Sequence, residues 1–242
     1  MNLLIDIGNT NLKWAVHEPG ALGEMLTVRH HGGLPIDLHA AWEDLPPPEQ
    51  VLVSNVGSDV VSTAVEHACR AHWDCVPRFV RTEPLCHGVR IAYEHPERLG
   101  VDRWLGLLAA RHASPGPVLV VDAGTAVTFD LLLKNGRHLG GLILPGVQMM
   151  RDSLLADTQI PRVAPEEPGE PWAADTATAI GAGSIQAPAA LAERLYHRLA
   201  EHANGAPEII LTGGDAERLL PAIGLPVRHH PDLILQGLSL LD

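Results

Sequence analysis

The N-terminal stretch of the chain contains the residue types that a phosphate site needs. The candidates are Asp6, Gly8, Asn9, Thr10 and Lys13. The glycine lets a phosphate approach the backbone N–H groups of a tight turn, and Lys13 adds a positive charge. A carboxylate such as Asp6 fits beside a triphosphate only when a divalent cation lies between them. The stretch therefore predicts a site for a nucleotide and Mg²⁺, and the alternative is an ordinary hairpin in which Asp6 caps its own loop.

A second candidate site lies at Gly100, Val101, Asp102 and Arg103, where the sequence opens a patterned helix. The dipole of a helix favours an acid in the first turn, so Asp102 needs no function to explain it. Arg103 fits a structural role less well, because a cation at the positive end of a helix is unfavourable. The pair makes chemical sense if Asp102 accepts a proton or a hydrogen bond from a substrate while Arg103 holds an anionic group.

The opening pattern occurs a second time in the middle of the chain. The apolar run from Val118 is followed by Asp122, Gly124 and Thr125, and Val127 begins a further strand. This similarity indicates an internal duplication in which each half is built on the same hairpin. Two such Asp-x-Gly turns can face each other across a cleft, each offering backbone donors and one carboxylate to the same polyphosphate and its metals.

The elements that position these groups are short strands and amphipathic helices. In the first part of the chain we expect strands at residues 3–7, 11–16, 25–29 and 51–53, and helices at residues 58–73 and from residue 100 onward. The first turn then lies inside an antiparallel hairpin, not at a Rossmann strand-to-helix junction. In the second part we expect strands at residues 118–123, 127–133, 138–144 and 208–212, a long helix at residues 176–203 and a loop at residues 161–173. Gly213 and Gly214 follow the last of these strands, where they either admit a ribose or a flat ring or form a plain connector.

Composition limits the class of protein. The chain has 242 residues, 46% of them hydrophobic, and no apolar stretch near the roughly 20 residues that cross a bilayer, so we expect a folded cytoplasmic protein without a membrane partner. Its formal net charge of -12 argues against nonspecific binding to nucleic acid. The three cysteines lack CxxC spacing, which favours reduced thiols. The fourteen histidines, including the pair His30–His31, form no recognisable ligand pattern and are expected in solvated loops.

Five motifs, taken in order, resemble the type III pantothenate kinase family, which also contains the Bvg accessory factors. They are Asp6-x-Gly8-Asn9-Thr10, Gly100-x-Asp102-Arg103, Asp122-x-Gly124-Thr125-Ala126-x-Thr128, Gly140-Gly141-x-Ile143-x-Pro145-Gly146 and Thr212-Gly213-Gly214-Asp215-Ala216. The resemblance implies the duplicated α/β, ribonuclease H-like fold of the actin-like, Hsc70 and acetate and sugar kinase superfamily, with two similar halves around a nucleotide cleft. We place the halves at residues 1–100 and 101–242.

The same resemblance implies an activity and its cofactors. The activity is ATP-dependent phosphorylation of pantothenate to 4'-phosphopantothenate, the first step of coenzyme A biosynthesis. The ATP phosphates would lie over Asp6 to Lys13 with Asp6 near Mg²⁺, and Thr125 would also contact ATP. Asp122 matches a ligand for a monovalent cation, K⁺ or NH₄⁺. The Gly213–Gly214 pair falls where the superfamily places its adenosine-side loop.

For the acceptor, the resemblance implies that Asp102 is the general base that takes the proton from the pantothenate hydroxyl. Tyr93, the segment Gly100 to Arg103 and Thr176 match positions that line the pantothenate pocket. Asp175 stands where the family pattern leads us to expect Asn. The resemblance also implies a homodimer with the pantothenate site close to the subunit interface.

Two alternatives stay open. The first is another kinase or phosphatase of the superfamily acting on a sugar, acetate or polyphosphate, which the Gly-x-Asp-Arg segment disfavours. The second is a regulatory accessory factor without important catalysis, which would be favoured had Asp6, Asp102 or Asp122 been replaced, and all three are intact.

Overall fold

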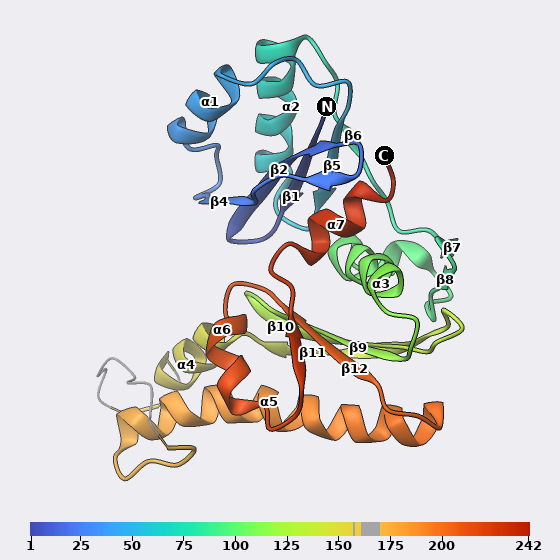
Figure 1. Cartoon of the computed structure of the whole chain (residues 1–242). Coiled ribbons are helices and arrows are strands. Elements are labelled where there is room, and N and C mark those ends of the chain that lie inside the picture. The colour runs from blue at the N-terminus through green and yellow to red at the C-terminus, as the bar shows by residue number, and fades with distance from the viewer. Residues whose placement is uncertain (157, 161–169) are drawn as a thin grey trace. The chain divides into compact units, whose positions relative to one another are not determined.

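The computed structural model describes residues 1–156, 158–160 and 170–242, and the chain forms two compact units (Figure 1). Unit 1 comprises Met1–His87, Tyr93–Ala109 and Asp232–Asp242, and unit 2 comprises Gly88–Ala92 and Ala110–Pro231. This division differs from the predicted boundary between residues 100 and 101. The physical reason is that apolar residues of the C-terminal helix are buried in unit 1, so the end of the chain returns to the first unit.

Unit 1 is built on a mixed sheet with strand order β3-β2-β1-β5-β6, in which β4 also pairs with β2. Its strands are β1 (Asn2–Ile7), β2 (Asn11–Glu18), β3 (Ala21–Leu22), β4 (Leu26–Arg29), β5 (Val51–Asn55) and β6 (Arg78–Phe79). Its helices are α1 (Ile36–Glu43), α2 (Asp59–Trp73), the 3-10 helix η1 (Pro96–Arg98), the start of α3 (Val101–Ala113) and α7 (Leu233–Ser239). β1 pairs antiparallel with β2 and parallel with β5.

The core of unit 1 follows from the alternation of its strands. Leu3, Ile5 and Ile7 of β1 are fully buried and pack in one cluster with Val61 and Val65 of α2. Each such side chain contributes about 1.5–3 kcal/mol by leaving water. Helix α7 contacts β1, β2 and β5. The first candidate turn begins at the end of β1, the central strand of this buried sheet.

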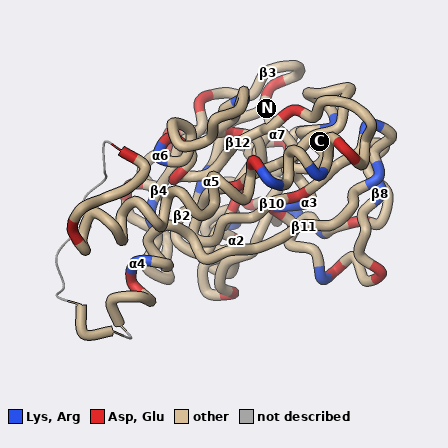
Figure 2. The backbone as a smooth tube through the Cα atoms, turned by 90° about the horizontal axis from the view of Figure 1, so that it is seen from below, with Lys and Arg blue, Asp and Glu red and all other residues tan. Residues whose placement is uncertain are grey.

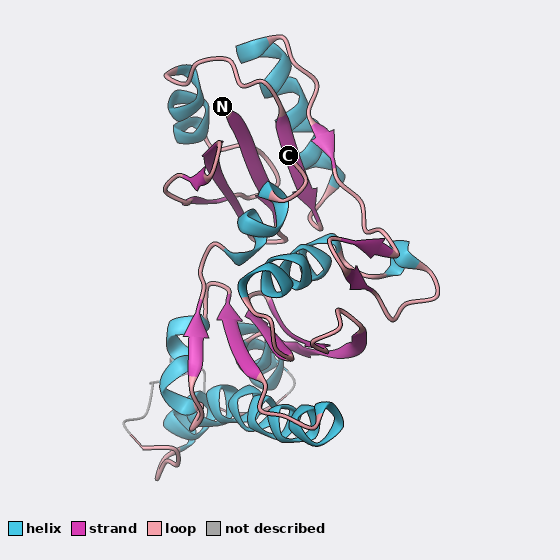
Figure 3. Ribbon diagram, turned by 45° about the vertical axis from the view of Figure 1, so that its right-hand side comes forward, coloured by secondary structure: helices cyan, strands magenta, loops and turns pink. Residues whose placement is uncertain are grey.

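Unit 2 repeats this plan with strand order β11-β10-β9-β12-β13. Its strands are β9 (Val118–Ala123), β10 (Ala126–Leu132), β11 (His138–Pro145), β12 (Glu208–Thr212) and β13 (Val227–His229). Its helices are α4 (Val147–Ala156), the long α5 (Thr176–Ala203), α6 (Ala216–Leu219) and the 3-10 helix η2 (Leu220–Ala222). Helix α5 covers one face of the sheet (Figure 3), where Ile185, Ala189 and Ala192 share a cluster with Val121 and Phe129. Of the predicted loop at residues 161–173, residues 161–169 lie outside the described part of the chain.

The predicted duplication is confirmed at the level of strand register. In unit 1, Asp6 pairs with Lys13 on the antiparallel partner and with Ser54 on the parallel partner. In unit 2, Asp122 pairs in the same way with Thr128 and Thr212. Each Asp-x-Gly turn therefore follows the central strand of its own sheet.

Surface charge does not divide the chain into a basic part and an acidic part. Lys and Arg residues are interspersed with Asp and Glu residues along the backbone (Figure 2). Among the described helices, none combines the length and apolar character needed to cross a bilayer.

Candidate functional site

The first Asp-x-Gly turn connects β1 to β2 within unit 1. The Gly8 N–H donates to the carbonyl oxygen of Asn11 at 2.9 Å, which closes the turn around Asn9 and Thr10. Since directly paired residues of antiparallel strands project from the same face, Asp6 and Lys13 lie on one face of the sheet. Asp6 is only 8% exposed. The predicted carboxylate, lysine and turn are thus brought together.

The loop after β5 supports this turn, and the sequence did not single it out. The Val56 and Gly57 N–H groups both donate to the carbonyl of Ile7, at 3.0 and 3.2 Å. A Cβ atom on Gly57 would lie 2.6 Å from the Gly8 carbonyl oxygen, so only glycine allows this approach. Asn55 accepts a hydrogen bond from the Gly57 N–H at 2.9 Å, which fixes the loop. The available signal was an Asn-x-Gly sequence directly after a buried strand.

Two histidines correct the expectation that the histidines lie in solvated loops. His30 is 7% exposed, and its Nε2 donates to the Gly8 carbonyl oxygen at 2.9 Å. His138 is 2% exposed and lies 3.0 Å from the Asp130 carboxylate through its own Nε2. The prediction failed because a lone histidine carries no local pattern, whereas its burial depends on strands that meet only in the fold. His30 belongs to the surroundings of the first turn.

The second candidate segment begins α3 in unit 1. The Asp102 carboxylate accepts a hydrogen bond from the Arg103 N–H at 2.7 Å, in keeping with an acid in the first turn of a helix. A Cβ atom on Gly100 would lie 2.6 Å from Asp102 Oδ1, so the glycine makes room for this carboxylate. The same Cβ would lie 3.9 Å from a methyl group of Val56, which belongs to the loop that holds the first turn. The start of α3 and the first turn therefore share one neighbouring loop.

Arg103 and Tyr93 form the second part of this segment. The Arg103 Nη1 donates to the Tyr93 hydroxyl at 3.3 Å, and the guanidinium carbon lies 6.0 Å from the centre of the ring. Arg103 is 8% exposed, and the face and hydroxyl of the tyrosine offset part of the cost of a cation at the start of a helix. The two residues that were predicted to meet one substrate are in contact with each other.

The second Asp-x-Gly turn lies in unit 2, together with the Gly213–Gly214 loop. The Gly124 N–H donates to the Ala126 carbonyl at 3.0 Å, so this turn is one residue tighter than the first. Gly213 has a φ of +98°, and a Cβ atom there would lie 2.5 Å from Asp122 Oδ1. The Asp122 carboxylate therefore packs directly on Gly213. Unit 2 brings together the predicted residues of the second turn and the adenosine-side loop.

A further glycine completes this second group. The Gly146 N–H donates to the Thr125 carbonyl at 3.0 Å. A Cβ atom on Gly146 would lie 2.4 Å from the carbonyl oxygens of both Gly124 and Thr125. Gly146 was part of a noted motif but was not predicted as a site residue. Its role here is to let the end of β11 close against the second turn.

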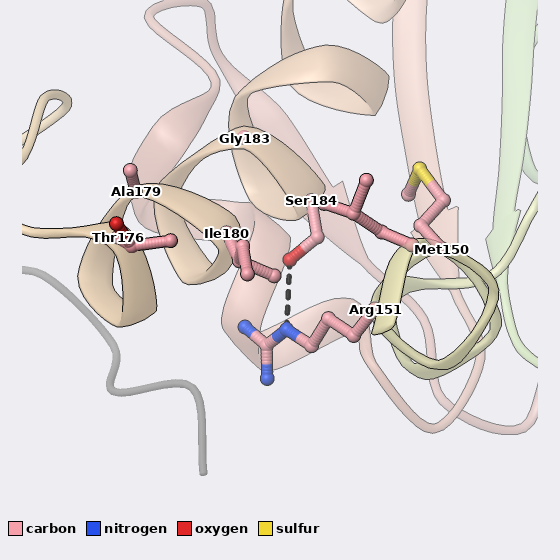
Figure 4. Close-up of a pocket in the computed structure, with 8 residues that line it drawn as sticks. Met150, Arg151, Thr176, Ala179, Ile180, Gly183 and Ser184 are labelled. Carbon is pink, nitrogen blue, oxygen red and sulfur yellow. Dashed lines mark hydrogen bonds between the residues drawn. The ribbon is translucent and has the colours of Figure 1, made fainter. Parts of the chain in front are cut away.

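Thr176 lines a cavity of about 530 Å³ between α4 and α5 (Figure 4). The lining residues are Met150, Arg151, Leu154, Thr176, Ala179, Ile180, Gly183 and Ser184. Arg151 is 4% exposed, and its Nε donates to the Ser184 hydroxyl at 2.8 Å. The cavity is therefore walled by apolar side chains with a cation and two hydroxyl groups, a composition typical of small-molecule sites.

Asp175, which stands before Thr176, has a structural function. It is the N-cap of α5, and its carboxylate accepts a hydrogen bond from the Thr178 N–H at 2.9 Å. This hydrogen bond holds the pKa of Asp175 below its usual range. Asn and Asp are both favoured N-caps, so the departure from the expected Asn leaves the position of Thr176 at the helix start unchanged.

The residues at both turns fit the cations that the sequence predicts. Mg²⁺ prefers carboxylate and phosphate oxygens, and Asp6 supplies a carboxylate at the end of the strand that leads into the first turn. A monovalent cation takes oxygen ligands such as backbone carbonyls. Asp122 Oδ1 and the Ala123 carbonyl oxygen both lie next to Gly213. The arrangement of the two turns around one nucleotide stays a prediction.

The fold first defines a class of protein. The chain is similar in structure to a Campylobacter jejuni protein of the Baf family of transcriptional activators, with a TM-score of 0.63 and 20% identity over 99% of this chain and 96% of that one. It is also similar to the ADPNP-bound activator of 2-hydroxyisocaproyl-CoA dehydratase from Clostridium difficile, with a TM-score of 0.56 and 13% identity over 99% and 93% of the two chains. These likenesses show the duplicated actin-like fold.

Sequence comparison then defines the family. Residues 2–198 match the family model described as type III pantothenate kinase. The chain is 38% identical to the type III pantothenate kinase of Nitrosococcus oceani, covering 99% of this chain and 92% of that protein. It is 36% identical to the type III pantothenate kinase of Burkholderia thailandensis, covering 99% and 96% of the two. The chain belongs to the type III pantothenate kinase family.

Proposed function

We infer that this protein is a pantothenate kinase, which transfers the γ-phosphoryl group of ATP to the 4'-hydroxyl of pantothenate. The observation that carries this function is membership of the family over nearly the whole chain, at 38% identity to a curated relative. In the reaction the pantothenate oxygen forms a bond to the γ-phosphorus while the bond between this phosphorus and the bridging oxygen of ADP breaks. The products are 4'-phosphopantothenate and ADP.

Asp102 is the proposed general base. Its carboxylate lies at the first turn of α3, where Gly100 leaves space beside it. A carboxylate within hydrogen-bond reach of the attacking hydroxyl accepts its proton as the new P–O bond forms. The helix backbone orients this carboxylate through the Arg103 N–H, so the base is fixed before the substrate binds.

The first turn is the proposed site for the ATP phosphates. Backbone N–H groups and the side chains of Asn9 and Thr10 supply donors, and Lys13 supplies a positive charge on the same face as Asp6. Asp6 would hold Mg²⁺ directly or through water, and the metal would neutralise charge that develops on the phosphates. This turn aligns the γ-phosphate for attack, which is the larger part of catalysis in phosphoryl transfer.

The second turn is proposed to hold the other end of the nucleotide. Thr125 and the Gly124 backbone would contact ATP, and the Gly213–Gly214 loop would lie along the adenosine. Asp122 would hold K⁺ or NH₄⁺. The contact between Asp122 and Gly213 supports a common role for these residues, because a change in one displaces the other.

Pantothenate carries a carboxylate at one end, which requires a cation in its pocket. Arg103 is the proposed partner, with Tyr93 orienting the guanidinium through its hydroxyl. Val101 at the helix start and Thr176 in the cavity of unit 2 are the remaining proposed contacts.

We also propose that the protein is a cytoplasmic homodimer. Leu142 and Ile143 of the edge strand β11 are 41% and 61% exposed, and Met149 at the start of α4 is 47% exposed. Exposed apolar residues on an unpaired sheet edge are typical of a surface that another subunit covers.

A substitution at the proposed base tests the mechanism. Asp102→Asn keeps the shape and the contact with Gly100 but cannot take a proton, so kcat with pantothenate should fall about 10²–10⁴-fold. Asp59→Asn, at the start of α2, is the matched control and should retain full turnover. Circular dichroism should show the same helical content in both variants. Normal turnover in Asp102→Asn would remove Asp102 as the base, whereas a wild-type protein that phosphorylates glucose or acetate instead would favour another kinase of the superfamily.

A further inference from the structure

The buried side chain of His30 lies against the first turn, and no part of the proposed chemistry uses it. It makes two hydrogen bonds to the turn: its ring Nε2 donates to the Gly8 carbonyl at 2.9 Å, and its backbone N–H donates to the Thr10 carbonyl at 3.1 Å. The two carbonyl groups flank Asn9, so His30 clamps the turn at both sides of this residue. We propose that His30 is a positioning residue that aims the Asn9 N–H at the ATP phosphates.

The geometry of the peptide bond gives the clamp its consequence. The chain contains no cis peptide among the described residues, and in a trans peptide the carbonyl and the following N–H point in opposite directions. The Gly8 carbonyl is held toward His30, so the Asn9 N–H points to the opposite side of the turn. A glycine peptide otherwise rotates easily, which would turn a donor away from a phosphate and present a carbonyl oxygen to it.

The hydrogen bond also determines the tautomer of the ring. A carbonyl oxygen only accepts, so the proton of the bond belongs to Nε2. The other ring nitrogen, Nδ1, is buried and has no hydrogen-bond partner among the described residues. Gly57 packs against the same Gly8 carbonyl. The Gly8 carbonyl oxygen therefore contacts both the His30 ring and the loop after β5.

This inference rests on the proposed function, because it assigns ATP to the first turn. The experiment compares the affinity for MgADP of three variants, measured by isothermal titration calorimetry without pantothenate. His30→Met fills the same space without a donor, and His30→Gln restores a donor. His31→Met makes the same change at the exposed neighbouring residue. We expect His30→Met to weaken MgADP binding about fivefold to tenfold, which is the effect of one buried hydrogen bond.

His30→Gln should remain within about twofold of the wild type, and His31→Met should equal it. In steady-state assays, His30→Met should raise the KM for MgATP and leave the KM for pantothenate unchanged. Equal MgADP affinity in His30→Met and the wild type would overturn the proposal, as would His30→Gln binding as weakly as His30→Met. A purely structural role would instead lower the melting temperature and move both KM values together.

A measurement on the wild type covers the case in which His30→Met does not fold. Nitrogen NMR of the histidine rings should show a proton on Nε2 of His30, and an Nε2 without a proton would overturn the proposal. The calorimetry also separates this inference from the proposed function. Wild-type protein that binds MgADP with the expected dependence on His30, but does not phosphorylate pantothenate, would contradict the function and support the clamp.

Discussion

Gly213 provides a test of how closely the second turn is packed. Its φ of +98° is a conformation that L-residues rarely adopt, and adopting it costs a non-glycine residue about 1–3 kcal/mol. A Cβ atom there would also lie 2.3 Å from the Ala123 carbonyl oxygen and 2.5 Å from Asp122 Oδ1. Because backbone must move to relieve this overlap, a further cost of about 1–3 kcal/mol follows. Gly213→Ala should therefore lower the free energy of unfolding by about 2–6 kcal/mol.

The adjacent glycine is the matched control. Gly214 is exposed, has no left-handed φ, and a Cβ atom there meets no heavy atom within 4 Å. Gly214→Ala should therefore change the free energy of unfolding by no more than about 0.5–1 kcal/mol, toward greater stability. For a chain of 242 residues, a loss of about 3 kcal/mol corresponds to a fall of roughly 6–12 °C in the melting temperature.

Thermal unfolding of the two variants is followed by circular dichroism, and their turnover is measured over a range of K⁺ concentrations. Gly213→Ala should also require more K⁺ than Gly214→Ala, because the added methyl group displaces the Asp122 carboxylate. Equal melting temperatures for the two variants would refute the packing described for Asp122, Ala123 and Gly213.

Two further predictions concern groups with altered pKa values. Burial raises the pKa of Cys69 to about 12, and burial also raises the pKa of Cys75 and Cys86; iodoacetamide at about pH 8 should therefore alkylate Cys69 last. Peptide mass spectrometry would measure this order, and early labelling of Cys69 would contradict its burial. The Thr178 N–H holds the pKa of Asp175 below its usual range, so the stability from this N-cap is present above the unfolded pKa and is lost as the pH falls through the folded one. The stability of the wild type, Asp175→Ala and Asp175→Asn is compared by circular dichroism from about pH 7 to about pH 3. Only the wild type should lose the stability of this cap in acid, and equal acid sensitivity in Asp175→Ala would contradict this role.

The sequence was sufficient to predict the duplication and most of the strands, but it did not reveal the helices α1 and α7. The Asp-x-Gly turns could be predicted because each is a short run of neighbouring residues. Glycine, Asp and Asn are typical of tight turns, so the residue types alone indicate the turn. The helix at residues 101–113 could be predicted because its apolar period is strong. The contact between Asp122 and Gly213 was not predicted, because it depends on β12 lying parallel to β9 in the sheet.

Other parts of the site depend on contacts between residues that are distant in sequence. His30 reaches the first turn only because β4 pairs with β2, and a single histidine carries no signal of that pairing. Gly57 meets Gly8 only because β5 lies parallel to β1. The return of α7 to unit 1 likewise depends on distant contacts, because α7 packs on β1, β2 and β5 of the first sheet. None of these contacts has a local pattern from which it could be predicted.

The measurement that tests the central claim most directly is phosphoryl transfer from MgATP to pantothenate by the purified protein. Pantothenate, glucose and acetate are offered separately as acceptors in potassium, ammonium and sodium buffers, and the products are identified by mass spectrometry. We predict 4'-phosphopantothenate as the sole phosphorylated product, formed in potassium or ammonium and much less in sodium. A folded protein that phosphorylates none of the three acceptors, or prefers glucose or acetate, would contradict the account.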